Sequence, residues 1–203
     1  MKTLVSALVG ISVMVVSVEA QERLARPEAL KYAFYAGLDL KQMTGTPIPT
    51  DPDLKRPVAI RHGDHGLLLL PEGKLKSSTL AAVGNEVVPI GQLWMVKIAP
   101  VVDKQPIPAS KLRMIEVRPD GGQGTAACCA LGVRKNSDNG FQLLIYGKEK
   151  EPLLAVPLKA ISGKEDPEAP LDIEAEREED SAKLTLKVLG KYEAVFQVGS
   201  SEQ

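Results

Sequence analysis

Aromatic residues are scarce in this chain of 203 residues: they make up 4% of it, and Trp94 is the only tryptophan. Proteins that bind sugars or single-stranded nucleic acids commonly stack aromatic rings against the ligand. The low aromatic content therefore argues against both kinds of binding module.

The chain also lacks an excess of charge of either sign. It has 25 Lys and Arg against 26 Asp and Glu, for a net charge of −1, and the two signs are interleaved along its length. Binding to nucleic acid or to an anionic membrane draws on a basic surplus or a basic stripe. We therefore expect no nucleic-acid partner.

Cysteine is limited to two adjacent residues, Cys128 and Cys129. Neighbouring side chains on a strand point to opposite faces, which excludes an ordinary disulfide between them. A strained vicinal disulfide, or a thiol that pairs with a second chain, would give the pair a redox role. The surrounding run of small residues, 125–131, favours instead two small hydrophobic side chains in a strand.

Motifs of well-known enzyme classes are missing. No Gly-x-Ser-x-Gly sequence occurs, and the glycine-rich segment 121–124 precedes an expected strand, whereas nucleotide-binding loops open a helix. No pair of carboxylates is distinguished by its context, and no repeat of fixed length is found. An enzyme is therefore not indicated, although acid–base chemistry stays open.

What the chain does have is an N-terminal segment typical of a secretory signal peptide. Lys2 gives a positive start, residues 4–18 are almost all apolar, and Val18 and Ala20 place small residues at −3 and −1 of a cleavage site before Gln21. The apolar run is shorter than the roughly 20 residues that a membrane-spanning helix needs. We expect removal of residues 1–20 and a mature chain that is exported, periplasmic or secreted, without a membrane span.

The segment that follows predicts one short helix and then an arm. Residues 26–28, Arg-Pro-Glu, resemble a helix start, and Leu30, Phe34 and Leu38 recur near helical spacing. Residues 46–52 carry three prolines and predict a linker laid over the surface.

From Pro57 onward, short apolar runs alternate with clusters of Gly, Pro, Asn and Asp, which is typical of antiparallel β-structure. We divide the mature chain into a helix and Pro-rich arm (21–56) and one β-domain (57–203). The predicted fold class is all-β: an antiparallel β-sandwich, with an open barrel as the alternative. The expected strands are 58–61, 66–70, 92–102, 111–118, 125–133, 141–146, 153–161, 171–176, 182–189 and 192–198. The last two form the clearest hairpin, since apolar residues alternate on both sides of Gly190.

Both histidines lie in one short segment, as His62, Asp64 and His65 with glycines between and after them. Imidazole and carboxylate groups in a tight turn can bind zinc, copper or iron, so these three residues are the candidate metal ligands and a divalent transition metal the candidate cofactor. The alternative is a plain hairpin turn whose imidazoles face water, and the spacing favours that turn. Trp94 raises a similar choice, between lining a binding groove and anchoring the core, and the core is favoured.

The C-terminal half resembles a family of exported bacterial β-sandwich domains of unknown function. The resemblance rests on residues 88–94, on 141–145 followed by 155–158, and on 182–187 leading into 194–198. It covers about residues 85–198, and the chain lacks the tryptophans that the family often has in its last hairpin and after its middle strand. The resemblance implies a sandwich, and no activity, substrate or catalytic residue.

These observations predict an exported β-sandwich that acts as a binding or structural envelope protein without catalysis. The alternative is a metal-binding protein or metal-dependent enzyme that uses His62, Asp64 and His65. A protein partner captured through exposed strand edges is a third hypothesis. The sequence does not determine the oligomeric state.

Overall fold

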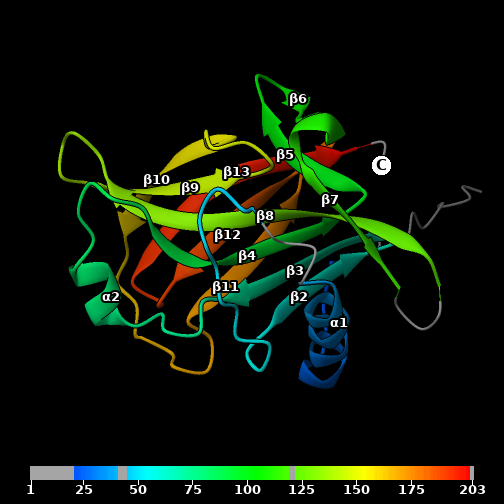
Figure 1. The fold of residues 1–203 in the computed structure, drawn as a ribbon, viewed down its shortest axis with the longest axis horizontal. Helices are drawn as coiled ribbons and strands as arrows, with labels where there is room; N and C mark the ends of the chain where they lie inside the picture. The colour runs from blue at the N-terminus through cyan, green and yellow to red at the C-terminus, as the bar shows by residue number, and fades with distance from the viewer. Residues whose placement is uncertain (1–20, 41–44, 119–121, 202–203) are drawn as a thin grey trace, which may run out of the picture.

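One antiparallel β-sheet, curled into a half-barrel, makes up most of the structure (Figure 1). The computed structural model describes residues 21–40, 45–118 and 122–201, so the predicted signal peptide lies outside the described residues. The helical elements are α1 (Arg26–Asp39), α2 (Ser77–Ala81) and the 3-10 turn η2 (Ala109–Lys111). The strands are β1 (Glu22–Arg23), β2 (Val58–His62), β3 (His65–Pro71), β4 (Val88–Val96), β5 (Ile98–Val102), β6 (Gln105–Pro106), β7 (Arg113–Val117), β8 (Gly124–Lys135), β9 (Phe141–Tyr146), β10 (Leu154–Ala160), β11 (Leu171–Arg177), β12 (Ser181–Val188) and β13 (Tyr192–Ser200).

The sheet runs in the order β1-β2-β3-β4-β8-β9-β10-β13-β12-β11, with β7 beside β8 and β5 beside β13. Two corners bend it. Strand β10 pairs with β9 through 154–158 and with β13 through Lys159 and Ala160, so it belongs to both halves. Between β4 and β5, Lys97 has a φ of 57°, and this break lets β5 leave β4 and pair with the end of β13.

The all-β antiparallel class with one N-terminal helix is confirmed, and the curled single sheet corresponds to the open-barrel alternative. Each expected strand region forms a strand, but the expected strand 92–102 is two strands separated at Lys97. The expected hairpin is present, with Leu184 opposite Phe196 and Leu186 opposite Ala194. None of the helices in the described ranges is long and apolar enough to cross a membrane.

The inner face of the sheet carries the main hydrophobic core, because inward residues recur at every second position of the strands. Leu69, Leu93, Leu131, Ile145 and Leu186 are among its fully buried members. A β-bulge at Ile90, between Pro89 and Gly91, keeps both Ile90 and Leu93 on this face, although they are an odd number of residues apart.

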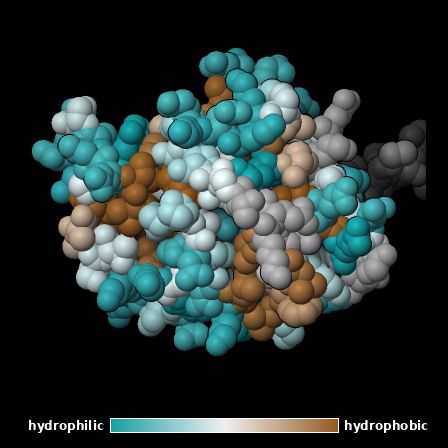
Figure 2. Space-filling model, viewed as in Figure 1, coloured by the Kyte–Doolittle hydropathy of each residue, from teal (hydrophilic) through white to brown (hydrophobic). Residues whose placement is uncertain are grey.

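The helix α1 covers part of the outer face, beside β2, β3 and β7. Its buried stripe consists of the small residues Ala29, Ala33 and Ala36, which pack near Leu68 and Trp94 of the sheet. Phe34 and Leu38, whose spacing suggested the helix, are both 60% exposed. Hydrophobic surface is visible in the area of α1 in Figure 2. The spacing of the large apolar residues therefore predicted the helix but not the face that packs against the sheet.

The Pro-rich arm packs along the outer face through specific contacts. Ile48 is buried against Ala130, Leu144 and Tyr146. The amide of Gln92, which is 1% exposed, donates to the Thr50 hydroxyl at 2.7 Å and accepts from the Trp94 indole N–H at 3.0 Å. Trp94 is therefore a core anchor, as the sequence favoured.

The two cysteines are free and buried on opposite faces of β8. Cys129 belongs to the inner core, where burial raises its pKa to about 12, and Cys128 faces the outer layer, where burial raises its pKa well above the usual value. The interpretation as two small hydrophobic side chains in a strand is confirmed, and both of them are buried.

The two ends of the sheet come together at a seam between β1 and β11. Arg23 forms an ion pair of 2.8 Å with Asp172, and Arg26 reaches Glu168 at 3.4 Å. Arg56 donates to the backbone oxygen of Pro167 at 2.8 Å. Polar bridges therefore take the place of strand pairing where the half-barrel stays open.

Candidate functional site

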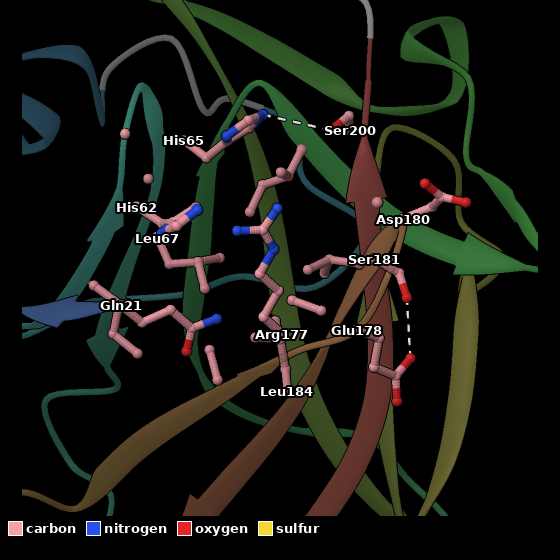
Figure 3. A pocket seen from close by; sticks show the side chains of 18 of the residues that line it. Gln21, His62, His65, Leu67, Arg177, Glu178, Asp180, Ser181, Leu184 and Ser200 are labelled. Atoms are coloured by element: carbon pink, nitrogen blue, oxygen red, sulfur yellow. Dashed lines mark hydrogen bonds between the residues drawn. The ribbon is translucent and has the colours of Figure 1, made fainter. Parts of the chain in front are cut away.

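A pocket of about 540 Å³ lies at one end of the half-barrel, between the β2–β3 and β11–β12 hairpins (Figure 3). The end of β13 closes its far wall. Pockets that bind small molecules commonly occupy about 300–1,000 Å³ and combine an apolar lining with a few convergent polar groups. This pocket meets both criteria.

The strand alternation explains the lining. On each strand, every second side chain points inward to the core, and the last of these inward residues lies at the mouth of the half-barrel. The core rows are apolar, and the mouth positions that end them are polar on four strands. These polar residues, which we call the mouth layer, are His62 on β2, His65 on β3, Arg177 on β11 and Ser200 on β13.

Arg177 is the charged member of the mouth layer. It continues the inward row of Leu171, Ile173 and Ala175, and its side chain points into the middle of the pocket in Figure 3. The lysines nearby are neutralised on the outer face, where Lys187 pairs with Glu174. No hydrogen bond or ion pair joins the Arg177 guanidinium to another residue within 21–40, 45–118 and 122–201.

His62 brings a second group that lacks a partner. It lies opposite His65 across the β2–β3 hairpin. Its Nδ1 atom is buried and has no hydrogen-bond partner in the part of the chain that the structure describes. An unpaired buried polar atom costs about 1–3 kcal/mol of stability.

His65 is held from both sides. Its Nδ1 lies 3.4 Å from an oxygen of Asp64, and its Nε2 lies 3.4 Å from the Ser200 hydroxyl. The other oxygen of Asp64 binds Lys97, and this contact lowers the pKa of the Asp64 carboxyl below its ordinary value. The carboxylate therefore stays ionised and favours the proton on Nδ1 of His65, which leaves Nε2 to accept from Ser200.

The order Asp64, His65, Ser200 is that of a hydrolase triad, but its geometry favours orientation over nucleophilic attack. Both contacts are at 3.4 Å, beyond the 2.5–3.2 Å range of strong hydrogen bonds. The Asp64 carboxylate is also shared with Lys97. We interpret this chain of contacts as a support that fixes the His65 ring at the pocket wall.

The predicted metal ligands lie on this hairpin but do not form a coordination set. No three His, Cys, Asp or Glu side chains of the described residues gather closely enough to hold a metal ion. Asp64 is directed to Lys97, while His62 and His65 line the pocket. A metal bound by His62, Asp64 and His65 stays a prediction for elemental analysis.

Several carboxylates stand at the rim of the pocket. Glu178 accepts hydrogen bonds from Ser181 at 3.0 Å and from Gln197 at 2.7 Å. In Figure 3 the carboxylates of Glu178 and Asp180 point away from Arg177. The rim is therefore negative, whereas the interior of the pocket holds a cation.

Comparisons with protein families, curated proteins and solved structures give no match.

Two members of the mouth layer, His62 and His65, were predicted as site residues from the sequence, whereas Arg177 and Ser200 were not. A signal for both was present, because the inward alternation that predicts β11 and β13 reaches Arg177 and Ser200 at its next step. That alternation does not reveal that the ends of these strands meet at one opening.

A second cavity, of about 430 Å³, lies on the outer face beside α1 and shares the β2–β3 turn with the pocket. Tyr32, Leu68, Trp94 and Val96 are among its lining residues. Its lining is mainly apolar, and its charged members Arg61, Asp64 and Lys97 are already ion-paired.

Proposed function

We propose that the protein is exported after removal of residues 1–20 and acts in the cell envelope as a non-catalytic binding protein, with the pocket at the mouth of the half-barrel as its ligand site. The observation that carries this proposal is the combination of Arg177 and His62, two polar groups without partners among the described residues, above an apolar floor. The unpaired buried Nδ1 of His62 costs free energy, and the exposed guanidinium of Arg177 is open to an anionic ligand.

Export is supported by the N-terminal sequence, whose positive start, apolar run and small residues near Ala20 are typical of a signal peptide. The resemblance of residues 85–198 to an exported β-sandwich family points in the same direction. Purification of the mature chain from the periplasm, with N-terminal sequencing that begins at Gln21, would test this part. A chain that keeps residues 1–20 would contradict it.

Binding can be tested with the mature chain, Gln21–Gln203, purified without a metal-binding tag. Native mass spectrometry followed by solvent extraction should detect a small organic molecule that copurifies. The variant Ala182→Phe, which places a ring in the pocket opposite Arg177, should lose that molecule and keep the fold. A bound molecule retained by this variant would place the site elsewhere.

The metal hypothesis is the second candidate, because His62 and His65 lie opposite each other on one hairpin. It predicts near one equivalent of zinc, copper or iron, which the double variant His62→Ala, His65→Ala would lose. The proposed organic-ligand site predicts a folded protein with no stoichiometric metal. Elemental analysis of both proteins decides between the two.

A further inference from the structure

We propose that the ligand of this pocket is an amphipathic carboxylate: a singly charged head bound by Arg177 and a hydrocarbon tail that lies on the apolar floor. This inference rests on the proposed function and names the class of ligand. It follows from three features of the pocket, which are the nature of its cation, the sign of its rim and the composition of its floor.

The cation favours a planar anion. A guanidinium presents its N–H groups as a rigid fork that matches the two oxygens of a carboxylate. Arg177 has this fork free of other described residues, and it points into the pocket (Figure 3).

The rim limits the charge of the head. Arg177 is the only Arg or Lys among the described lining residues, whereas Asp64, Glu178, Glu179 and Asp180 all line the pocket. A phosphate with two negative charges would meet one cationic side chain and the carboxylates of Glu178, Glu179 and Asp180. A carboxylate carries only the single charge that Arg177 neutralises, so the rim selects for it.

The floor favours a hydrocarbon tail. Below the mouth layer the pocket is lined by aliphatic side chains that belong to the inner core: Ile60, Leu67, Ile98, Leu184 and Val198. Each methylene group that such a surface removes from water adds about 0.8 kcal/mol to binding, or roughly a fourfold change in Kd. The volume of about 540 Å³ admits a tail of several carbons beyond the head.

The test uses the mature protein and defined probes: butanoate, hexanoate and octanoate as a length series, octan-1-ol as the uncharged tail, and octyl phosphate as the dianion. Calorimetry gives Kd, and methyl NMR signals of Leu67, Leu184 and Val198 locate the probe. We expect octanoate to bind in the pocket, with Kd rising roughly fourfold for each methylene removed. We expect octyl phosphate to bind more weakly than octanoate.

Arg177→Gln should weaken octanoate binding about 10- to 100-fold and leave octan-1-ol unchanged, because a hydrogen bond to a charged group is lost. Arg177→Lys should lie between the two, since it keeps the charge and loses the fork. Arg118→Gln, which removes an exposed arginine that does not line the pocket, is the matched control and should bind as the parent does. Since Arg177 is exposed at the end of β11, these variants should fold.

Equal affinity for octan-1-ol and octanoate, or no effect of Arg177→Gln, would overturn the carboxylate head and leave the proposed function standing. A flat length series would overturn the tail, and tighter binding of octyl phosphate would overturn the single charge. No shift of the pocket methyl groups with any probe, together with no copurified molecule, would overturn this inference and the proposed function together.

Discussion

The buried amide of Gln92 links the Pro-rich arm to the sheet, and its loss should destabilise the protein by a measurable amount. In Gln92→Met a side chain of similar length replaces the amide. Trp94 Nε1 then loses its acceptor at 3.0 Å, and the Thr50 hydroxyl loses its donor at 2.7 Å. Gln92 is 1% exposed and Trp94 is 3% exposed, so water does not readily replace the lost bonds.

The magnitude follows from the cost of orphaned polar groups. Each buried group left without a partner costs about 1–3 kcal/mol, and the removed amide no longer needs to be desolvated, which offsets part of the sum. We expect the free energy of unfolding to fall by about 2–4 kcal/mol. In a domain of this size the melting temperature should drop by roughly 5–15 °C.

Urea unfolding followed by tryptophan emission is a suitable assay, because Trp94 is the only tryptophan and is itself a member of the contact. Thr50→Val and the double variant complete a cycle whose coupling energy should be about 1–2 kcal/mol. Gln105→Met, at an exposed glutamine, is the matched control and should change stability by less than about 0.5 kcal/mol. A Gln92→Met variant as stable as this control would refute the assigned role of the amide.

Three other predictions concern the sheet, the arm and the thiols. Gly91→Ala should lower the free energy of unfolding, measured by urea titration, by about 3 kcal/mol or more. The φ of Gly91 is +155°, and a Cβ there would lie 2.3 Å from the Leu70 oxygen. Gly84→Ala is the control and should be near neutral, because open space surrounds Gly84. Burial raises the pKa of the Glu72 carboxyl above its ordinary value. The protonated carboxyl therefore stabilises the folded protein at low pH, and this stabilisation is lost as pH rises through the raised pKa. Between pH 4 and 7 the urea concentration at the unfolding midpoint should fall less in Glu72→Gln than in the parent. Neither cysteine should react with iodoacetamide before unfolding, since both thiols are buried, and a dimer band lost on reduction would contradict this.

Only some residues of the candidate site can be recognised from the local sequence pattern. The segment His62 to His65 stands out in the sequence because both histidines fall there, and the structure places both at the pocket. Arg177 and Ser200 carry no such mark in the sequence. They become site residues because the sheet curls until the ends of β2, β3, β11 and β13 meet at one opening.

The sequence by itself determined the strands and their faces, because side chains alternate with a period of two whatever the strand pairs with. That local rule located the hairpin around Gly190 and placed the two cysteines on opposite faces of one strand. The tertiary structure decided the rest: the corner at Lys97, the double role of β10, and a helix that docks through Ala29 and Ala33. These features depend on partners far away in the chain. The alanines of the helix form its packing face only because the folded sheet comes close enough to contact such small side chains.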